Sequence, residues 1–103
     1  MESIGQGRFA DPVVLILSSL AEMPRHGHAL YLDIKRFAGV ELGPGTLYGA
    51  LSRLEERGLI EPAEPQGRRR PYRITQLGTE ALREYLLHTR AVADIGLRRL
   101  AST

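Results

Sequence analysis

A very short connection between two amphipathic helical segments leaves few folds open to this 103-residue chain. The first segment ends at Gly39, where a glycine suits a left-handed helix cap, and the second begins near Pro44 and ends at Gly58. The first segment's expected apolar residues are Leu30, Ile34 and Phe37, with Asp33, Lys35 and Arg36 on the solvated side. Because only residues 39–42 separate the two segments, the pattern predicts a helix-turn-helix rather than an extended bundle.

A helix before this pair and a hairpin after it complete the expected domain. Asp11 and Pro12 suit the N-cap and the first position of a helix that ends before Pro24. Residues 59–61 and 72–75 are strand-like and bracket a segment with proline, glycine and arginine, which predicts a β-hairpin. Two strands alone are marginal in water and need helices behind them. We therefore expect a mainly α fold with a small β-hairpin, namely a winged helix-turn-helix.

The sequence at the end of the chain predicts a long helix, whose apolar stripe is too long for one small domain to cover. Thr75 is the expected N-cap of a helix of about 25 residues, which is roughly 38 Å long at the standard rise. Apolar residues recur along its whole length. We expect residues 76–103 to be a C-terminal dimerisation helix of a two-fold homodimer, helped by the first helix or the N-terminal arm. Residues 1–75 are then the winged helix-turn-helix domain with that arm.

The composition excludes several function classes. The chain has no cysteine, hence no disulfide, thiolate metal site or cysteine nucleophile. His26 and His28 do not share a helical face and His88 stands alone, so no metal site is expected. We find no nucleophile elbow and no glycine-rich phosphate loop, and therefore expect no catalytic residue, no cofactor and no enzyme. No segment predicts a membrane span or a secretory signal, so a cytoplasmic location is expected.

The distribution of charge is more informative than the net charge of +2. Residues 1–65 carry a net −3, residues 66–75 carry four arginines and no acid, and residues 76–103 carry +1. Consecutive guanidiniums at a hairpin tip repel one another unless an anion receives them, and arginine suits phosphates or a narrow minor groove. A solvated turn is the alternative, but the missing acids favour nucleic acid. The candidate wing residues are Gly67, Arg68, Arg69 and Arg70, whereas Arg73 points either into solvent or toward Glu61.

The second helix of the pair carries the other candidate residues. On a helical wheel, its leucines gather on one face, and the opposite face is small and uncharged toward its N-terminus. A glycine at position 49 costs about 1 kcal/mol relative to alanine, which is explained either by close approach to a DNA major groove or by a simple weak spot. The candidate DNA-binding residues of this helix are Thr46, Tyr48, Gly49, Ser52 and Arg53.

Two segments of the chain resemble a known family. The stretch from Leu42 to Ile60, with Gly-Pro-Gly-Thr-Leu-Tyr at 43–48, and the stretch from Gly67 to Gly78 are similar to the signature of the PadR family of bacterial transcriptional regulators. Residues 24–30 resemble the family's segment that opens the preceding helix, and the whole resemblance covers about residues 12–86.

This resemblance implies a homodimeric repressor that places the helix carrying Thr46 and Tyr48 in a major groove and lays residues 67–70 on the backbone or minor groove of a palindromic operator. The short end of the chain resembles the smaller subfamily, in which a single C-terminal helix pairs across the dimer. His28 stands where the family usually has tyrosine, and its imidazole is a candidate phosphate donor. Gly49 stands where the family commonly has proline.

We therefore expect a sequence-specific DNA-binding transcriptional regulator whose partners are double-stranded DNA and a second copy of the chain. The alternative is a winged-helix protein-interaction module without DNA binding. A third interpretation, compatible with the first, is a sensor that holds a small apolar effector between the terminal helices. Its candidate lining residues are Tyr85, Val92 and Ile95, for each of which an ordinary dimer core is the favoured interpretation.

Overall fold

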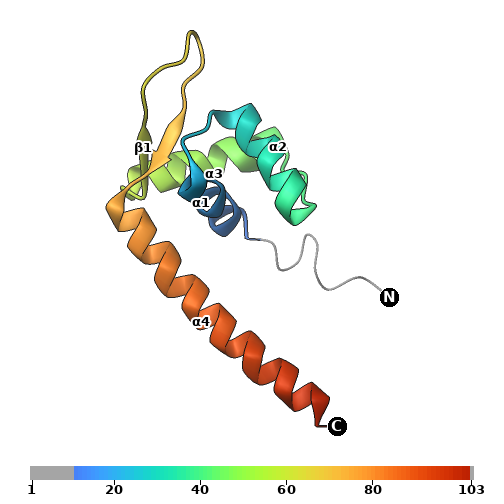
Figure 1. The fold of residues 1–103 in the computed structure, drawn as a ribbon. Helices are drawn as coiled ribbons and strands as arrows, with labels where there is room; N and C mark the ends of the chain where they lie inside the picture. Colours follow the sequence, from blue (N-terminus) through green and yellow to red (C-terminus); the bar gives the residue numbers. More distant parts are fainter. Residues whose placement is uncertain (1–10, 103) are drawn as a thin grey trace.

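The computed structural model describes residues 11–102, and in this range the chain forms four helices and one two-stranded antiparallel sheet (Figure 1). The elements are α1 (Pro12–Glu22), α2 (Gly27–Ala38), α3 (Pro44–Glu56), β1 (Ile60–Pro62), β2 (Tyr72–Ile74) and α4 (Gln76–Ala101). The predicted mainly α fold with a small hairpin is confirmed. Gly39 and Gly58 adopt the left-handed backbone expected of helix-ending glycines, with φ of 69° and 74°. The expected N-terminal arm lies outside the described residues.

The hydrophobic core is built around α1, which packs against α2, α3, α4 and β2. Its buried residues come from every helix, from β1 and from the connection between α2 and α3, and they are Ile16, Leu17, Leu20, Leu30, Ile34, Leu42, Leu47, Ala50, Leu51, Leu54, Ile60 and Leu82. The prediction for Phe37 is wrong, because half of its surface is exposed. Phe37 lies in the last turn of α2, where Ala38 rather than Phe37 packs against the buried cluster.

A polar network that crosses between helices also corrects the expectation for Asp33. Its side chain is 14% exposed rather than solvated. Asp33 Oδ2 accepts a hydrogen bond of 2.6 Å from Ser19 Oγ and lies 3.6 Å from Nη1 of Arg25, whose guanidinium also donates to the Ser19 carbonyl oxygen. The network satisfies a buried hydroxyl and ties α2 to α1, so the charge at position 33 stabilises the fold.

The hairpin, which we call the wing (residues 60–74), is paired in the register Ile60↔Ile74, Glu61↔Arg73 and Pro62↔Tyr72. Arg73 points toward Glu61, since its Nε donates to Oε2 at 2.7 Å. The segment between α1 and α2 pairs with β2 through a single antiparallel bridge, which the sequence did not predict. Arg25 and Tyr72 exchange backbone hydrogen bonds of 3.1 and 2.9 Å, which fix the base of the wing to the start of α2.

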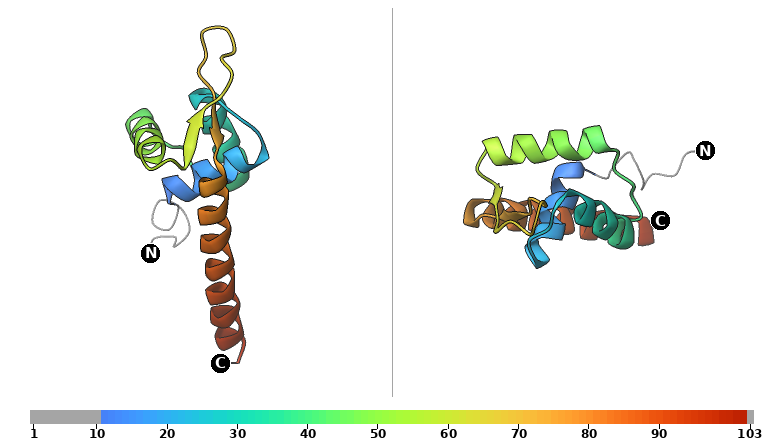
Figure 2. Two further views of the ribbon diagram at one scale, coloured as in Figure 1. Left: turned by 90° about the vertical axis from the view of Figure 1, so that its left-hand side faces the viewer. Right: turned by 90° about the horizontal axis from the view of Figure 1, so that it is seen from above.

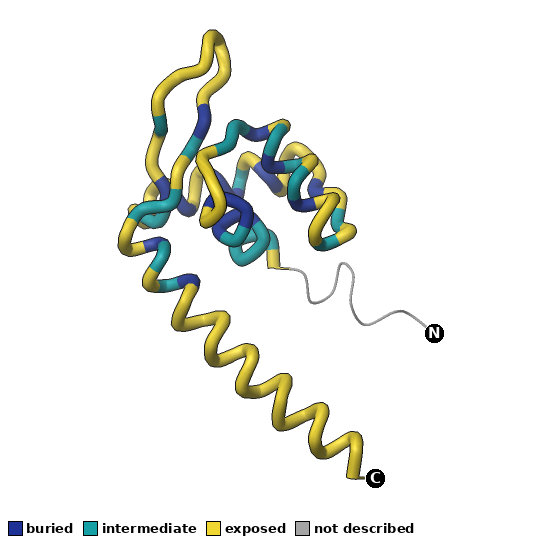
Figure 3. The backbone as a smooth tube through the Cα atoms, in the orientation of Figure 1, coloured by how far each residue is buried: buried dark blue, intermediate teal, exposed yellow. Residues whose placement is uncertain are grey.

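The helix α4 begins directly at the end of the wing. Thr75 is its N-cap as predicted, since Oγ1 accepts from the Gly78 backbone N–H at 3.0 Å. Gly78 is buried, and a Cβ there would overlap the Leu59 carbonyl oxygen and come within 2.9 Å of Ile74 Cγ1. From residue 83 onward every described residue of α4 is exposed (Figure 3). The wing tip and the free end of α4 lie at opposite ends of the molecule (Figure 2).

Candidate nucleic-acid interface

The N-terminal half of α3 presents an uncharged surface. Pro44 occupies its first turn, Gly43 is the N-cap, and neither a capping side chain nor an acidic residue is present in this described turn. The backbone N–H groups at this end therefore have no side-chain acceptor, and the positive end of the helix dipole is not neutralised. Thr46 is exposed on this turn, and Tyr48 is 53% exposed in the next.

Tyr48 lies across the beginning of α2. A Cβ at Gly27 would come within 2.8 Å of Tyr48 Cζ, so the glycine allows the tyrosine ring to seat on the backbone of α2. His28 is exposed beside it, and its ring stacks on Tyr31 with 6.2 Å between centroids. The two helices thus bring Tyr48 and His28 to one exposed surface, where both side chains line the same hollow.

The glycines of α3 are not required by packing. A Cβ at Gly49 would meet only Arg53 Nη1, at the ordinary distance of 3.6 Å, and a Cβ at Gly45 would meet nothing within 4 Å. Ser52 and Arg53 extend the same exposed surface, and Glu55 follows. The space above Gly49 is therefore open to something outside the described chain.

The wing tip holds the three consecutive arginines away from the body. Gln66 and Arg69 exchange backbone hydrogen bonds of 3.1 and 3.0 Å around a two-residue turn. Gly67 has φ of 64° and Arg68 has negative φ, a combination typical of a type II′ hairpin turn. Among residues 11–102, none of Arg68, Arg69 and Arg70 forms a salt bridge. These three guanidiniums are available to an external anion.

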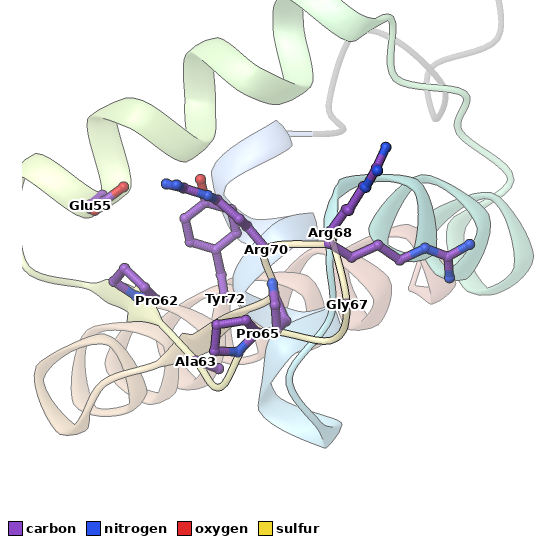
Figure 4. A pocket seen from close by; sticks show the side chains of 10 residues that line it. Glu55, Pro62, Ala63, Pro65, Gly67, Arg68, Arg70 and Tyr72 are labelled. Atoms are coloured by element: carbon purple, nitrogen blue, oxygen red, sulfur yellow. The ribbon is translucent and has the colours of Figure 1, made fainter.

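A groove of about 480 Å³ joins the wing tip, the start of α2 and Tyr48. Its lining contains no carboxylate and consists of His26, Gly27, His28, Tyr48, Arg68, Arg69, Arg70 and Tyr72. An adjoining hollow of about 540 Å³ is lined by the wing and by Glu55 of α3. Figure 4 shows Arg68 and Arg70 extending from the wing toward the side on which α3 lies. We call the first hollow the basic groove.

The candidate residues of α4 are not part of this interface. Tyr85, Val92 and Ile95 are 47%, 55% and 41% exposed, and they lie on the part of α4 that leaves the body. Their helical spacing puts them on one face, opposite Arg83 and Asp94. Within residues 11–102, no helix is apolar enough over a sufficient length to span a membrane, and no three acidic or histidine side chains gather to hold a metal ion.

The sequence interpretation missed His26. It is the N-cap of α2, with Nδ1 placed 3.4 Å from the Ala29 backbone nitrogen, and its Nε2 lies 3.3 Å from Nη1 of Arg69. Histidine is not among the preferred N-cap residues, so the helix-start pattern gave no signal for it. The contact with Arg69 joins residues 43 positions apart and is visible only in the fold.

A helix-turn-helix formed by α2 and α3, packed on α1 and followed by a β-hairpin wing, defines a winged helix-turn-helix protein. The family model of the transcriptional regulator PadR-like family matches residues 16–84, and the chain belongs to this family. The expected resemblance is thus confirmed. The family consists of transcriptional regulators and not of enzymes, which agrees with the function class expected from the motifs.

Three known proteins illustrate the similarity. The chain is 47% identical over 75 residues to an uncharacterized 37.1 kDa protein in transposon TN4556 of Streptomyces fradiae, covering 73% of this chain and 22% of that protein. It is 43% identical over 72 residues to transcriptional regulator Rv3488 of Mycobacterium tuberculosis, covering 67% and 66%. The crystal structure of a PadR family transcription regulator from Clostridium difficile R20291 has a TM-score of 0.77 at 23% identity, covering 86% of this chain and 97% of that one.

The matches thus span about a fifth and about two thirds of the two relatives' lengths.

Proposed function

We propose that this chain binds double-stranded DNA sequence-specifically as a transcriptional regulator. The observation that carries the proposal is the basic groove. Its three arginines form no salt bridge within the described residues 11–102, they lie beside the uncharged half of α3, and no carboxylate is among the lining residues. A major groove about 12 Å wide admits a helix whose exposed side chains are small. Arginines at the edge of such a helix meet phosphates or enter the neighbouring minor groove.

The proposed roles follow from position on α3. Thr46 and Tyr48 read base edges, Gly49 permits the closest approach, and Ser52 and Arg53 contact the flanks of the groove. The acidic Glu55 and Glu56 at the other end of α3 repel phosphates, which supports docking through the N-terminal half, as in helix-turn-helix proteins generally. The phosphate-contacting set comprises His28, Gly67, Arg68, Arg69 and Arg70.

A homodimer on a palindromic operator completes the proposal. Residues 76–103 act as the dimerisation helix, because the exposed apolar face of α4 needs a second copy to cover it, and residues 1–75 act as the DNA-binding domain. Two-fold symmetry then requires two half-sites, which we expect about 34 Å apart, one turn of DNA. Membership of the family supports the regulatory role, and the proposed role is that of a repressor in the cytoplasm.

Release by a small apolar effector between the paired helices is the remaining part of the proposal. Tyr85, Val92 and Ile95 lie on one exposed face of α4, where two copies would enclose a ligand. An added ligand that occupies this interface is expected to lower DNA retention.

Selection of duplexes from a random pool tests DNA binding directly. The expected result is enrichment of a palindromic sequence, with retention falling steeply between about 0.05 and about 0.2 M salt. Changes at Thr46 or Tyr48 are expected to alter the enriched sequence, since these side chains face the bases. A winged-helix protein-interaction module, the alternative, would show no salt-dependent retention of any duplex.

Gly49→Ala is expected to separate stability from DNA affinity. The open space at position 49 accommodates a methyl group, so the free energy of unfolding should rise by about 0.5–1 kcal/mol. The same methyl group would fill the closest approach to DNA and lower affinity for the selected duplex about tenfold, equivalent to roughly 1.4 kcal/mol.

Chemical denaturation and fluorescence anisotropy measure the two effects. The matched control is Gly78→Ala, where the added Cβ overlaps the Leu59 carbonyl oxygen and should destabilise the fold by about 1–3 kcal/mol. Unchanged DNA affinity in Gly49→Ala would show that this glycine is only a weak spot in α3.

A further inference from the structure

His26 and Arg69 place two hydrogen-bond donors face to face at the edge of the basic groove. Nε2 of His26 lies 3.3 Å from Nη1 of Arg69. Nδ1 of the same ring caps α2 by accepting from the Ala29 backbone N–H. A neutral imidazole accepts at one nitrogen only, so with Nδ1 accepting, the ring hydrogen is on Nε2. That hydrogen points at a guanidinium, which offers donors alone, and the two groups have no hydrogen bond to share.

The protonation state of the ring agrees with this arrangement. Burial, the Arg69 charge and His28 together hold the pKa of His26 below its ordinary value. The ring is therefore neutral at physiological pH, and Nδ1 keeps its lone pair for the helix cap. In this state the N–H at Nε2 and the guanidinium of Arg69 are both donors, so neither group can accept a hydrogen bond from the other.

An anionic oxygen lying against both donors would satisfy them. The surroundings favour such an anion, because the groove is lined by arginine, histidine, tyrosine and glycine without a carboxylate. The first turn of α2 also holds no acidic residue, so the positive end of its dipole faces the same region. A polyanion whose charges are spaced along a surface therefore fits better than a neutral ligand.

We propose that His26 and Arg69 together bind one phosphate of the DNA backbone, with the neutral imidazole donating from Nε2 while its Nδ1 caps α2. The phosphate would join the start of α2 to the wing tip and fix the wing against the duplex. This inference rests on the proposed function, because its occupant is DNA. It gives His26 a binding role separate from its structural role as a cap.

Two substitutions separate these roles, because each preserves one nitrogen of the ring. The amide of asparagine lies where Nδ1 does, so His26→Asn keeps the cap acceptor and loses the outward donor. The amide of glutamine reaches the position of Nε2, so His26→Gln keeps the donor and loses the cap. The probe is a mixed-sequence duplex of about 30 base pairs at low salt, since phosphate contacts do not depend on sequence.

His26→Asn is expected to melt at the wild-type temperature but to bind the duplex about tenfold more weakly, as for the loss of one hydrogen bond to a charged group. His26→Gln should melt about 4–8 °C lower and retain affinity within about threefold. A purely structural histidine would give the opposite result, with affinity following melting temperature, and would overturn the proposal.

A double-variant cycle tests whether the two residues share one phosphate. Arg69→Gln should weaken binding about tenfold, and adding His26→Asn to it should weaken binding by less than threefold more. Losses that multiply would mean two independent contacts and would overturn the shared site while leaving DNA binding intact. Failure of the wild-type protein to bind the duplex would overturn the proposed function and this inference together.

Discussion

Replacing Arg68, Arg69 and Arg70 together by alanine is expected to weaken binding to every duplex about hundredfold near 0.1 M salt. Each exposed guanidinium that contacts a phosphate contributes about 1 kcal/mol, and together they release about three counterions on binding. The slope of log affinity against log salt should therefore become shallower by roughly 2.7. The thermal unfolding curve should not move, because the three side chains are exposed and form no salt bridge within residues 11–102.

The matched control removes three arginines from elsewhere. Arg83, Arg90 and Arg98 are exposed on α4, which runs away from the wing (Figure 1). Their joint replacement by alanine changes the net charge equally and should alter the salt slope by less than about 1. Anisotropy titrations at several salt concentrations measure both variants, and equal slopes in the two would refute the assignment of the wing to phosphate.

Val92→Glu is expected to convert the proposed dimer into a monomer. Val92 lies on the apolar face of α4, and each dimer carries the substitution twice. Burying a carboxylate in an apolar interface costs several kcal/mol, so the dimer dissociation constant should rise more than about a hundredfold. Affinity for a palindromic duplex should fall to that of a single half-site, because the two halves no longer bind as one unit.

Leu87→Glu is the control for this experiment. Leu87 is 51% exposed and Val92 is 55% exposed, so the two side chains have similar access to solvent in the single chain. Leu87 lies on the charged side of the helix near Arg83 and Asp94, where a carboxylate remains in water. Sedimentation velocity should show a monomer for Val92→Glu and a dimer for Leu87→Glu. Equal behaviour would place the dimer contact elsewhere.

The elements of the fold were predictable because local patterns decide them. Apolar spacing located α1 and α3, while Asp11, Thr75 and the two left-handed glycines marked helix ends through chemistry within a few residues. The predictions of burial for Asp33 and Phe37 were wrong for the same reason. Whether a residue at the margin of a stripe is buried depends on which neighbour covers it, and Arg25 with Ser19 covers Asp33 whereas the last turn of α2 lacks such cover for Phe37.

The sequence likewise indicated some features of the candidate site and not others. The arginine run and the small residues of α3 are visible as composition, so the sequence indicated both surfaces. The groove that the arginine run shares with Tyr48 of α3 depends on the pairing of Tyr72 with Arg25, which the sequence does not show. His26 was missed because its two partners are a backbone group that other residue types usually cap and a side chain 43 positions away.

The junction between the wing and α4 has a consequence for the spacing of DNA sites. The chain passes from Ile74 through Thr75 into α4 without a linker, and Gly78 is pressed against the Leu59 backbone, so the junction has no hinge. In the proposed dimer each DNA-binding domain is therefore held rigidly by its α4. The distance between the two domains is set by the point at which the two α4 helices cross. One residue added to α4 would rotate the DNA-binding domain about the helix axis by about 100° and shift it along that axis by about 1.5 Å. The length of α4 therefore determines the spacing of the DNA half-sites.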